Sequence, residues 1–303
     1  MQTFYMMVGL PGSGKSFAAD NIPGAIIHSS DAIRAEILGD VNRQDQQDLV
    51  FQTLHERVMR DLADGKSVVY DATNTNYKRR MAFLQRINAM NLSCFNVCVF
   101  LATPYVDCLK GNANRERQVP ESVIKRMYER FDIPMMCEGW DAIWIEDNGY
   151  SYPSIHDTLH RLITIEHDNP HHEFSIGKHC LAAWSYLEEH YPNPDLVLSR
   201  ATLLHDLGKE STKVFHNGRG NPTDIAHYYH HEHTSAYDSF TYTTDMSDED
   251  RLKVALLVRW HMWPYVVEKS DNPSKTLRRV IQLLGEDIWK QIMVLHDCDL
   301  HAH

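Results

Sequence analysis

Residues 9–16 read Gly9-Leu10-Pro11-Gly12-Ser13-Gly14-Lys15-Ser16, and this stretch decides the fold of the first half of the chain. It follows an apolar run, Thr3–Val8, that predicts a strand, and it opens a helical pattern near residue 15. The stretch fits the P-loop pattern Gly-x4-Gly-Lys-Ser/Thr in full, in the strand-then-helix context that the pattern requires. The sequence therefore predicts a phosphate-binding loop.

Each position of this loop has an expected task. Glycines let successive backbone N–H groups curl around phosphates, and the helix amino terminus adds its positive dipole end. We expect Lys15 to touch the β- and γ-phosphates and the Ser16 hydroxyl to hold Mg²⁺. The predicted cofactors are ATP or GTP with Mg²⁺, wrapped by the remaining loop positions Gly9, Pro11, Gly12, Ser13 and Gly14.

Strand and helix patterns alternate before residue 150. This alternation predicts an α/β domain in which a parallel sheet is flanked by helices. The expected strands are Thr3–Val8, Ala25–His28, Ser67–Tyr70, Phe95–Leu101 and Ala142–Ile145, with helices near 15–21, 31–38, 45–64, 77–90, 105–115 and 121–131.

Histidine divides the chain into two parts. Of its 19 histidines, only His28 and His55 lie before residue 150. The turn-forming segment Asp147–Ser154 is a plausible boundary, which gives domains 1–150 and 151–303. Strand signals nearly vanish in the second, so we expect it to be all-α, with helices near 176–190, 196–207, 226–242, 248–261, 275–284 and 286–299.

Two acids follow predicted strands, where ligands bind in a doubly wound sheet. Asp31 comes after the second strand and could accept a proton from an acceptor hydroxyl, as a carboxylate does in kinases. Arg34, one helical turn later, could hold an anionic part of the acceptor; a helix cap and a surface charge are the simpler alternatives. Asp71, after the third strand, fits a magnesium-binding acid. Thr73 and Asn74 either support the site or form a turn.

The segment Lys110–Pro120 joins two predicted helices and is rich in cations, so we expect it to be a lid. An arginine in a lid can neutralise charge on the transferred phosphoryl group. Arg115 is the first candidate for this role and Arg117 the second. An exposed helix end with ordinary ion pairs is the simpler alternative, and it applies more to Arg117 than to Arg115.

Four segments, in order and spacing, resemble the kinase domain of phage-type 5′-hydroxyl polynucleotide kinases: GLPGSGKS, SSDAIR, VVYDATNTNYKRR and NANRERQVPESVIKRM. The resemblance covers roughly residues 1–135. It implies that Asp31 is the general base, that Arg34 contacts the acceptor phosphate and that Arg115 clamps a phosphate. The chain departs from the family beside the base, where Ser29, Ser30 and Ala32 stand. Nucleosides, small metabolites and protein side chains therefore stay open as acceptors.

In the second half, an adjacent pair, His205-Asp206, ends an apolar helical pattern. His179, His231, His261 and Asp299 each fall in or beside a separate predicted helix. A helical bundle can aim such nitrogen and carboxylate ligands at one metal centre.

The order H…HD…H…H…D, with HDLGK, YHHEHTSA, RWHMWP and HDCDLHAH, resembles the HD phosphohydrolase superfamily over roughly residues 165–303. The resemblance implies that His179, His205, Asp206 and Asp299 bind a first divalent metal (Mn²⁺, Mg²⁺, Ni²⁺, Co²⁺ or Fe²⁺). His231 and His261 would bind a second metal or the substrate phosphate. Lys209 could help to hold that phosphate, and His172 is a rival ligand. We expect the following to be bystanders: His171, His230, His233, Asp297, His301 and His303.

Composition limits the cellular setting and the partners. The net charge of −11 argues against a protein that coats nucleic acid through a broad basic surface. A nucleic-acid end held in a local pocket stays possible, and residues 110–130 carry a local excess of cations. No stretch approaches the roughly 18 apolar residues of a membrane helix. We expect a cytoplasmic protein that does not contact membranes.

The two resemblances together predict a bifunctional enzyme that heals nucleic-acid ends. Its kinase would phosphorylate a 5′-hydroxyl end of RNA or DNA, and its HD domain would remove a 3′- or 2′,3′-cyclic phosphate. A separate RNA ligase could then act downstream. Two alternatives stay open: a small-molecule or nucleoside kinase fused to a nucleotide phosphohydrolase, and a nucleotide-gated module whose HD domain only senses a ligand.

Overall fold

The computed structural model describes residues 1–115, 117–147, 153–170 and 173–302. The chain divides into two compact units, of which the first comprises Met1–Tyr128 and Pro134–Tyr150. The second unit comprises Glu129–Ile133 and Ser151–His303, so a five-residue segment from the first half of the chain packs with the second. The predicted boundary at Asp147–Ser154 falls largely outside the described residues.

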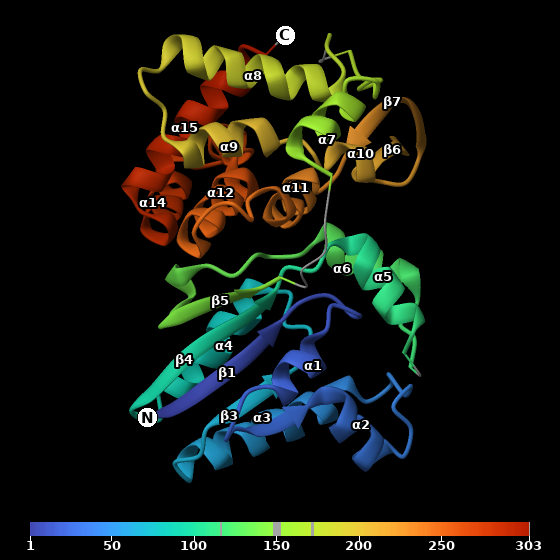
Figure 1. Cartoon of the computed structure of the whole chain (residues 1–303), viewed down its shortest axis with the longest axis vertical. Coiled ribbons are helices and arrows are strands. Elements are labelled where there is room, and N and C mark those ends of the chain that lie inside the picture. Colours follow the sequence, from blue (N-terminus) through green and yellow to red (C-terminus); the bar gives the residue numbers. More distant parts are fainter. Residues whose placement is uncertain (116, 148–152, 171–172, 303) are drawn as a thin grey trace. The chain divides into compact units, whose positions relative to one another are not determined.

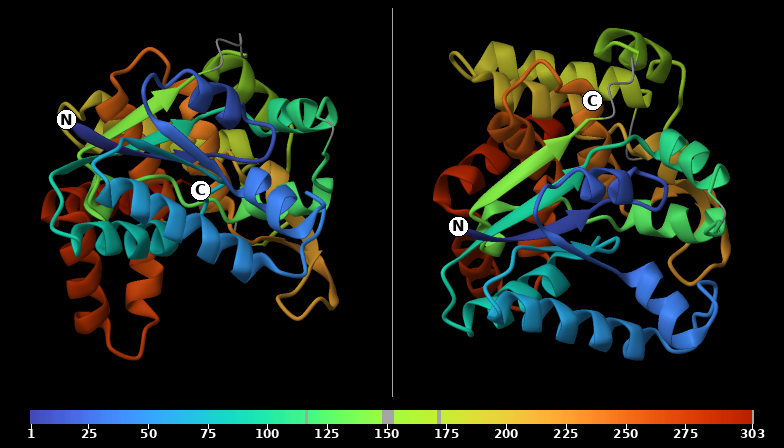
Figure 2. Two further views of the ribbon diagram at one scale, coloured as in Figure 1. Left: turned by 90° about the horizontal axis from the view of Figure 1, so that it is seen from below. Right: turned by 60° about the horizontal axis from the view of Figure 1, so that its bottom comes forward.

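The first unit is built on five parallel strands in the order β2-β3-β1-β4-β5 (Figure 1). The strands lie side by side in both views of Figure 2. The predicted parallel sheet with flanking helices is confirmed, and element ends differ from the predicted ones by a few residues. The strands are β1 Gln2–Val8, β2 Ile26–Ser29, β3 Val68–Asp71, β4 Cys94–Leu101 and β5 Ala142–Glu146.

Helices connect these strands and cover the sheet. Phe4 of β1 and Tyr70 of β3 pack against Phe83 of α4 on one face, with their rings tilted or edge-on. Met7, Val69 and Val99 pack with Ala19 of α1 in another cluster. The helices are α1 Lys15–Asp20, α2 Ser30–Leu38, α3 Gln47–Ala63, α4 Tyr77–Asn88, α5 Tyr105–Ala113 and α6 Glu121–Glu129, with a short 3-10 turn, η1, at Met136–Glu138.

The strand order places a crevice at the carboxyl ends of β1 and β3. After β1 the chain forms β2 and β3 on one side of β1, and it then crosses to form β4 and β5 on the other side. The direction of the crossover connections therefore reverses between β1 and β3. Ligands of open α/β sheets bind at such a switch point. The Gly9 N–H donates to the Thr73 carbonyl across the crevice at 3.0 Å.

The second unit is a helical bundle with one hairpin. Helices α8, α9, α11, α12 and α15 pack on one another. No helix in the described ranges is long and apolar enough to cross a membrane. The helices are α7 Ile155–Leu162, α8 Ile176–His190, α9 Leu196–Leu204, α10 Lys209–Thr212, α11 His231–Ser239, α12 Asp248–Trp260, α13 Trp263–Glu268, α14 Pro273–Leu284 and α15 Glu286–Leu300, with a 3-10 turn, η2, at Phe240–Tyr242.

The expectation of an all-α second domain is wrong at the hairpin. Strands β6 Lys213–His216 and β7 Pro222–Tyr228 pair antiparallel, and the helix expected over 226–242 begins only at His231. The loop between the strands turns at Asn217, whose side-chain oxygen accepts from the N–H groups of Arg219 and Asn221. Gly220, with a φ of 82°, completes the turn. Two short β-type runs around a Gly- and Asn-rich loop are a hairpin signal.

Candidate functional site

The predicted phosphate loop links β1 to α1 at the switch point. Gly12 and Gly14 both have positive φ, 81° and 93°, a conformation that favours glycine. The buried Lys15 Nζ donates to the Leu10 carbonyl at 2.6 Å and lies 3.4 Å from Ser13 Oγ. Burial lowers the pKa of Lys15 to about 8, against the opposing charge of Asp71. The lysine is thus held inside the loop, where an anionic phosphate would raise its pKa again and so stabilise its charged form.

Gly12 also meets α5 at very short range. A Cβ at this position would lie 2.1 Å from the Cys108 carbonyl oxygen and 2.6 Å from the Asn112 nitrogen. From the other side, a Cβ on Gly111 would lie 2.3 Å from the Gly12 carbonyl oxygen. The loop and α5 therefore pack backbone against backbone, which fixes the shape of the loop.

Gly12→Ala should destroy this packing and with it nucleotide binding. Gly24→Ala is the matched control, because Gly24 has a similar φ of 73° but nothing within 4 Å of an added Cβ. The control should lose only the roughly 1–2 kcal/mol of a left-handed alanine. Thermal unfolding with and without Mg²⁺-ATP measures both effects. We expect the ATP-dependent rise in melting temperature to persist in Gly24→Ala and to vanish in Gly12→Ala; an equal rise in both contradicts this packing role.

Ser16 and Asp71 form a candidate magnesium site. Ser16 Oγ donates to Asp71 Oδ2 at 3.0 Å, and Asp71 is buried at the end of β3. Burial raises the pKa of Asp71, although Lys15 and Ser16 act in the opposite direction. A hydroxyl and a carboxylate at this spacing offer the oxygen ligands that Mg²⁺ prefers.

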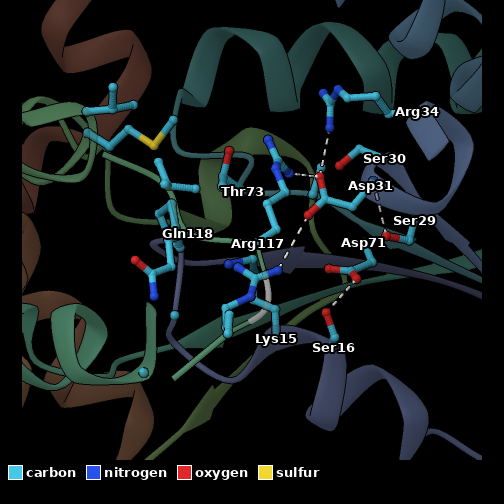
Figure 3. A pocket seen from close by; sticks show the side chains of 18 of the residues that line it. Lys15, Ser16, Ser29, Ser30, Asp31, Arg34, Asp71, Thr73, Arg117 and Gln118 are labelled. Atoms are coloured by element: carbon cyan, nitrogen blue, oxygen red, sulfur yellow. Dashed lines mark hydrogen bonds and ion pairs between the residues drawn. The ribbon is translucent and has the colours of Figure 1, made fainter. Parts of the chain in front are cut away.

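Three arginines contact Asp31, and Figure 3 labels two of them, Arg34 and Arg117. Its Oδ1 accepts from Arg34 Nη1 at 2.7 Å and from Arg117 Nη1, and its Oδ2 lies 3.4 Å from Arg115 Nη2. Arg34 is buried, with 4% of its side chain exposed, and also donates to Gln47. The Ser29 hydroxyl accepts from the Asp31 N–H and caps α2. Asp31 thus caps nothing itself, and Arg34 is no solvated surface charge.

These residues line one pocket of about 910 Å³. Its wall includes the loop, Asp71, Thr73 and both candidate lid arginines, so the structure brings the predicted kinase residues together. Arg117 is less exposed than Arg115, 17% against 38%, although Arg115 was the first candidate.

A buried ion pair that sequence reasoning missed supports this edge of the sheet. Arg80 donates to both carboxylate oxygens of Glu138, at 2.7 and 2.6 Å, and to the Asn74 carbonyl at 2.9 Å. Asn74, with a φ of 47°, donates to the Met7 carbonyl at 2.8 Å and so ties the end of β3 to β1. The available signal was a charged residue on the apolar face of α4 that carries Phe83, Leu84 and Ile87.

In the second unit, four predicted ligands converge between α8, α9 and α15. His179 Nε2 lies 3.2 Å from His205 Nε2, 3.2 Å from Asp206 Oδ2 and 3.0 Å from Asp299 Oδ1. His205 is fully buried and directly follows α9. The four donor atoms could hold one metal ion.

Asp206 also belongs to a second group. Its other oxygen, Oδ1, lies 3.3 Å from His231 Nε2 and 3.8 Å from His261 Nε2. Asp206 with His231 and His261 could therefore hold a second ion, and the carboxylate would bridge the two.

Backbone carbonyls orient all four imidazoles. The Nδ1 atoms lie 2.7 to 2.9 Å from the carbonyl oxygens of Ala302, Thr202, Tyr228 and Val258, for His179, His205, His231 and His261 respectively. A carbonyl only accepts, so each Nδ1 carries the proton. The Nε2 atoms of His231 and His261 then face each other at 3.3 Å with lone pairs. A cation between them removes that repulsion, so the donor set fits a metal.

The surroundings shift the pKa of His205 and the pKa of His261 in opposite directions. Burial alone would lower the pKa of His205, yet Asp206 and Asp299 raise it well above its ordinary value. Burial lowers the pKa of His261 to about 3, and its histidine neighbours act in the same direction. His261 is therefore neutral, as a metal ligand must be.

Gly208 and Lys209 complete the turn after the His-Asp pair. A Cβ on Gly208 would lie 2.0 Å from Thr234 Oγ1 and 2.6 Å from the His231 carbonyl oxygen, so only glycine lets this turn meet α11. Lys209 Nζ lies 2.6 Å from Asp206 Oδ2 and 3.4 Å from His167 Nε2. His167, 1% exposed, was not among the sequence candidates, because no motif surrounds it.

The described residues that were expected to be bystanders do not belong to either of the two ligand groups described above. Asp297 accepts from the Tyr191 hydroxyl, and His301 Nδ1 lies 2.8 Å from the Asp297 carbonyl. His230 and His233 form a further group with Glu232 that could hold an ion, although His230 is exposed. The rival ligand His172 and the bystanders His171 and His303 lie outside the described residues.

Comparison with known proteins finds similarity in the first unit. Residues 4–134 match the family described as AAA domain. The curated L-seryl-tRNA(Sec) kinase of Methanococcus maripaludis is 31% identical over 150 residues, which cover 45% of this chain and 55% of the relative. The chain thus spans about half the length of that relative. The first unit is a P-loop kinase domain.

Solved structures with similar parts share little sequence with the chain. A putative kinase from Chloroflexus aurantiacus has 13% identity and a TM-score of 0.42, covering 49% of this chain and 86% of its own. A structure of a Pnkp1/Rnl/Hen1 complex has 18% identity and a TM-score of 0.32, covering 39% and 41%. A gluconokinase from Sinorhizobium meliloti has 16% identity and a TM-score of 0.35, covering 49% and 84%.

Proposed function

We propose that this P-loop kinase domain transfers the γ-phosphate of ATP or GTP to the 5′-hydroxyl end of a nucleic acid, and that the second unit is an HD-type phosphohydrolase. The observation that carries the kinase half is the Asp31 carboxylate, bound by three arginines in the pocket of the phosphate loop. A carboxylate serves as base, and the cations match phosphates on both the donor and the acceptor.

The transfer itself assigns a task to each group. Asp31 takes the proton of the acceptor hydroxyl while that oxygen bonds to the γ-phosphorus. The bond from the γ-phosphorus to the bridging oxygen breaks, and the nucleoside diphosphate leaves. Lys15, Arg115 and Arg117 neutralise charge on the phosphoryl oxygens. Arg34, held by Asp31 and Gln47, binds the acceptor phosphate. Bound Mg²⁺, held through Ser16 and Asp71, would supply further charge neutralisation.

Charge in the pocket favours a nucleic-acid acceptor. Among the described residues, five cationic side chains line it (Lys15, Arg34, Arg79, Arg115 and Arg117) against the carboxylates of Asp31 and Asp71, within a chain of net charge −11. Such local concentration suits an acceptor that carries phosphate. The similar seryl-tRNA(Sec) kinase supports an acceptor hydroxyl carried on RNA.

Asp31→Asn tests the base directly. The amide keeps the shape of the side chain but cannot take a proton at neutral pH, so we expect a loss of turnover of about 100-fold or more, since general base catalysis contributes roughly 100- to 10,000-fold. Binding of ATP, measured by titration calorimetry, should stay within about threefold of the wild-type affinity. The assay follows γ-labelled ATP with a 5′-hydroxyl oligonucleotide, a nucleoside and a seryl-tRNA. Undiminished turnover by Asp31→Asn contradicts the base, and label only on the nucleoside favours a small-molecule kinase.

The proposal for the second unit rests on the convergence of six ligands on two adjacent positions. A divalent metal (Mn²⁺, Mg²⁺, Ni²⁺, Co²⁺ or Fe²⁺) held by His179, His205, Asp206 and Asp299 would lower the pKa of a bound water and polarise a phosphate ester. Asp206 Oδ1 lies beside His231 and His261. A carboxylate oxygen at this place favours binding of a second metal by these residues over direct binding of the substrate phosphate. Lys209, beside Asp206, would hold the phosphate of the substrate.

Metal content tests this assignment without reference to activity. After incubation with Mn²⁺ and gel filtration, we expect about two ions per wild-type chain by elemental analysis and about one in His261→Ala. His301→Ala is the matched control, because His301 is an exposed histidine on the backbone of Asp297. It should keep both ions. Equal metal content in wild type and in a His205→Ala, Asp206→Ala double variant means that the cluster is a protonated His-Asp network instead.

Together the two activities would heal broken RNA. Cleavage that leaves a 5′-hydroxyl and a 2′,3′-cyclic phosphate creates ends that a ligase cannot join. The kinase would install the 5′-phosphate, and the HD unit would remove the 3′- or 2′,3′-cyclic phosphate, after which a separate RNA ligase could act. The alternative is a small-molecule or nucleoside kinase fused to a nucleotide phosphohydrolase.

A further inference from the structure

Four arginines line the described part of the kinase pocket, and one of them has no task in the proposed reaction. Arg34, Arg115 and Arg117 all bind Asp31. The side chain of Arg79 makes no hydrogen bond or ion pair with any part of the chain that the structure describes. It is nevertheless part of the same pocket wall as Asp31 and Thr73.

The backbone of Arg79 is firmly placed although its side chain is free. It stands in the first turn of α4, where its N–H donates to the capping Asn76 side chain at 3.1 Å. The next residue, Arg80, is 1% exposed and binds Glu138 and the Asn74 carbonyl. That clamp fixes the start of α4 to the strand end that carries Asp71, so Arg79 is held at a set place on the rim.

The charges around Arg79 leave it without a counter-ion. The carboxylates in the described pocket wall belong to Asp31, which binds three arginines, and Asp71, which binds Ser16. The α3 side of the wall is neutral, with Asn42, Gln44, Gln47 and Phe51. A guanidinium in a cationic pocket whose α3 side is neutral is suited to an anion that the ligand brings, and guanidinium matches phosphate in geometry.

We propose that Arg79 forms a subsite for the second phosphodiester of the acceptor strand, counted from the 5′-hydroxyl. The inference rests on the proposed function. Arg34 contacts the base Asp31 and so takes the first phosphate beside the reacting nucleotide. Arg79 makes no contact with Asp31 and stands on a different element, so it meets the strand farther from the reacting hydroxyl. The subsite makes the kinase prefer a strand of three or more nucleotides to a mononucleotide or dinucleotide.

A series of acceptors of increasing length tests this subsite. The acceptors are a nucleoside 3′-phosphate, a dinucleotide with one phosphodiester and a trinucleotide with two, each with a 5′-hydroxyl. Arg79→Ala should lower kcat/KM about tenfold for the trinucleotide, the effect of one charged hydrogen bond, and leave the two shorter acceptors unchanged. The slope of log KM against log salt for the trinucleotide should fall by about 0.7, as expected for one phosphate contact on a single strand. Arg79→Lys should restore part of the loss.

Lys78→Ala is the matched control, because Lys78 is an adjacent exposed cation outside the pocket wall. It should behave as wild type on every acceptor. Equal losses for the dinucleotide and trinucleotide in Arg79→Ala, or no loss on either, overturn the second-phosphate subsite. A wild-type enzyme that phosphorylates none of the three contradicts the proposed function itself, whereas a wild type active on all three with no length effect in Arg79→Ala removes only the subsite.

Discussion

The parallel pairing of β1 with β3 is the constraint on which the kinase site depends. It brings the phosphate loop, which leaves β1, to within one hydrogen bond of the turn that leaves β3, through Gly9 N–H and the Thr73 carbonyl. Asn74 and the buried Arg80–Glu138 pair close the same turn. Ser16 and Asp71 can therefore meet at 3.0 Å. Removing one partner of a buried ion pair leaves an uncompensated charge, so Arg80 and Glu138 support the site as a unit.

In the second unit, the candidate metal site depends on one carboxylate, that of Asp206. Asp206 offers one oxygen to His179 and His205 and the other to His231 and His261. It can do so because Gly208 lets the turn after α9 approach α11 backbone to backbone. The carbonyl partners of the four imidazoles then fix every Nε2 toward this acid. Helix ends thus set the donor geometry, while the bundle supplies the buried, low-dielectric surroundings that strengthen it.

The sequence predicted best the features that depend on local spacing. The P-loop pattern and strand-helix alternation are local, and the parallel sheet they indicate is present. Asp31 and Arg34 are one helical turn apart, and the structure joins them at 2.7 Å. The HD-type spacing named six residues that the fold collects. Features with long-range or weak signals were missed. The Arg80–Glu138 pair joins residues 58 apart in the sequence, and no motif surrounds His167. The hairpin at 213–228 directly precedes the start of a helix, so the end of its β pattern was read as part of that helix. The role of Arg79 needed the pocket, because only the charges of its neighbours show that it lacks a counter-ion.

We propose above that one chain modifies both ends of a broken RNA through two independent sites. The most direct measurement uses one short RNA with a 5′-hydroxyl and a 2′,3′-cyclic phosphate, incubated with γ-labelled ATP, Mg²⁺ and Mn²⁺, and resolves both ends. For the wild-type chain we expect label at the 5′ end and loss of the cyclic phosphate. Asp31→Asn should lose only the label, and a His205→Ala, Asp206→Ala double variant only the cyclic phosphate opening. A wild-type chain that labels no RNA and leaves the cyclic phosphate intact, while consuming ATP with a nucleoside or metabolite, would contradict it.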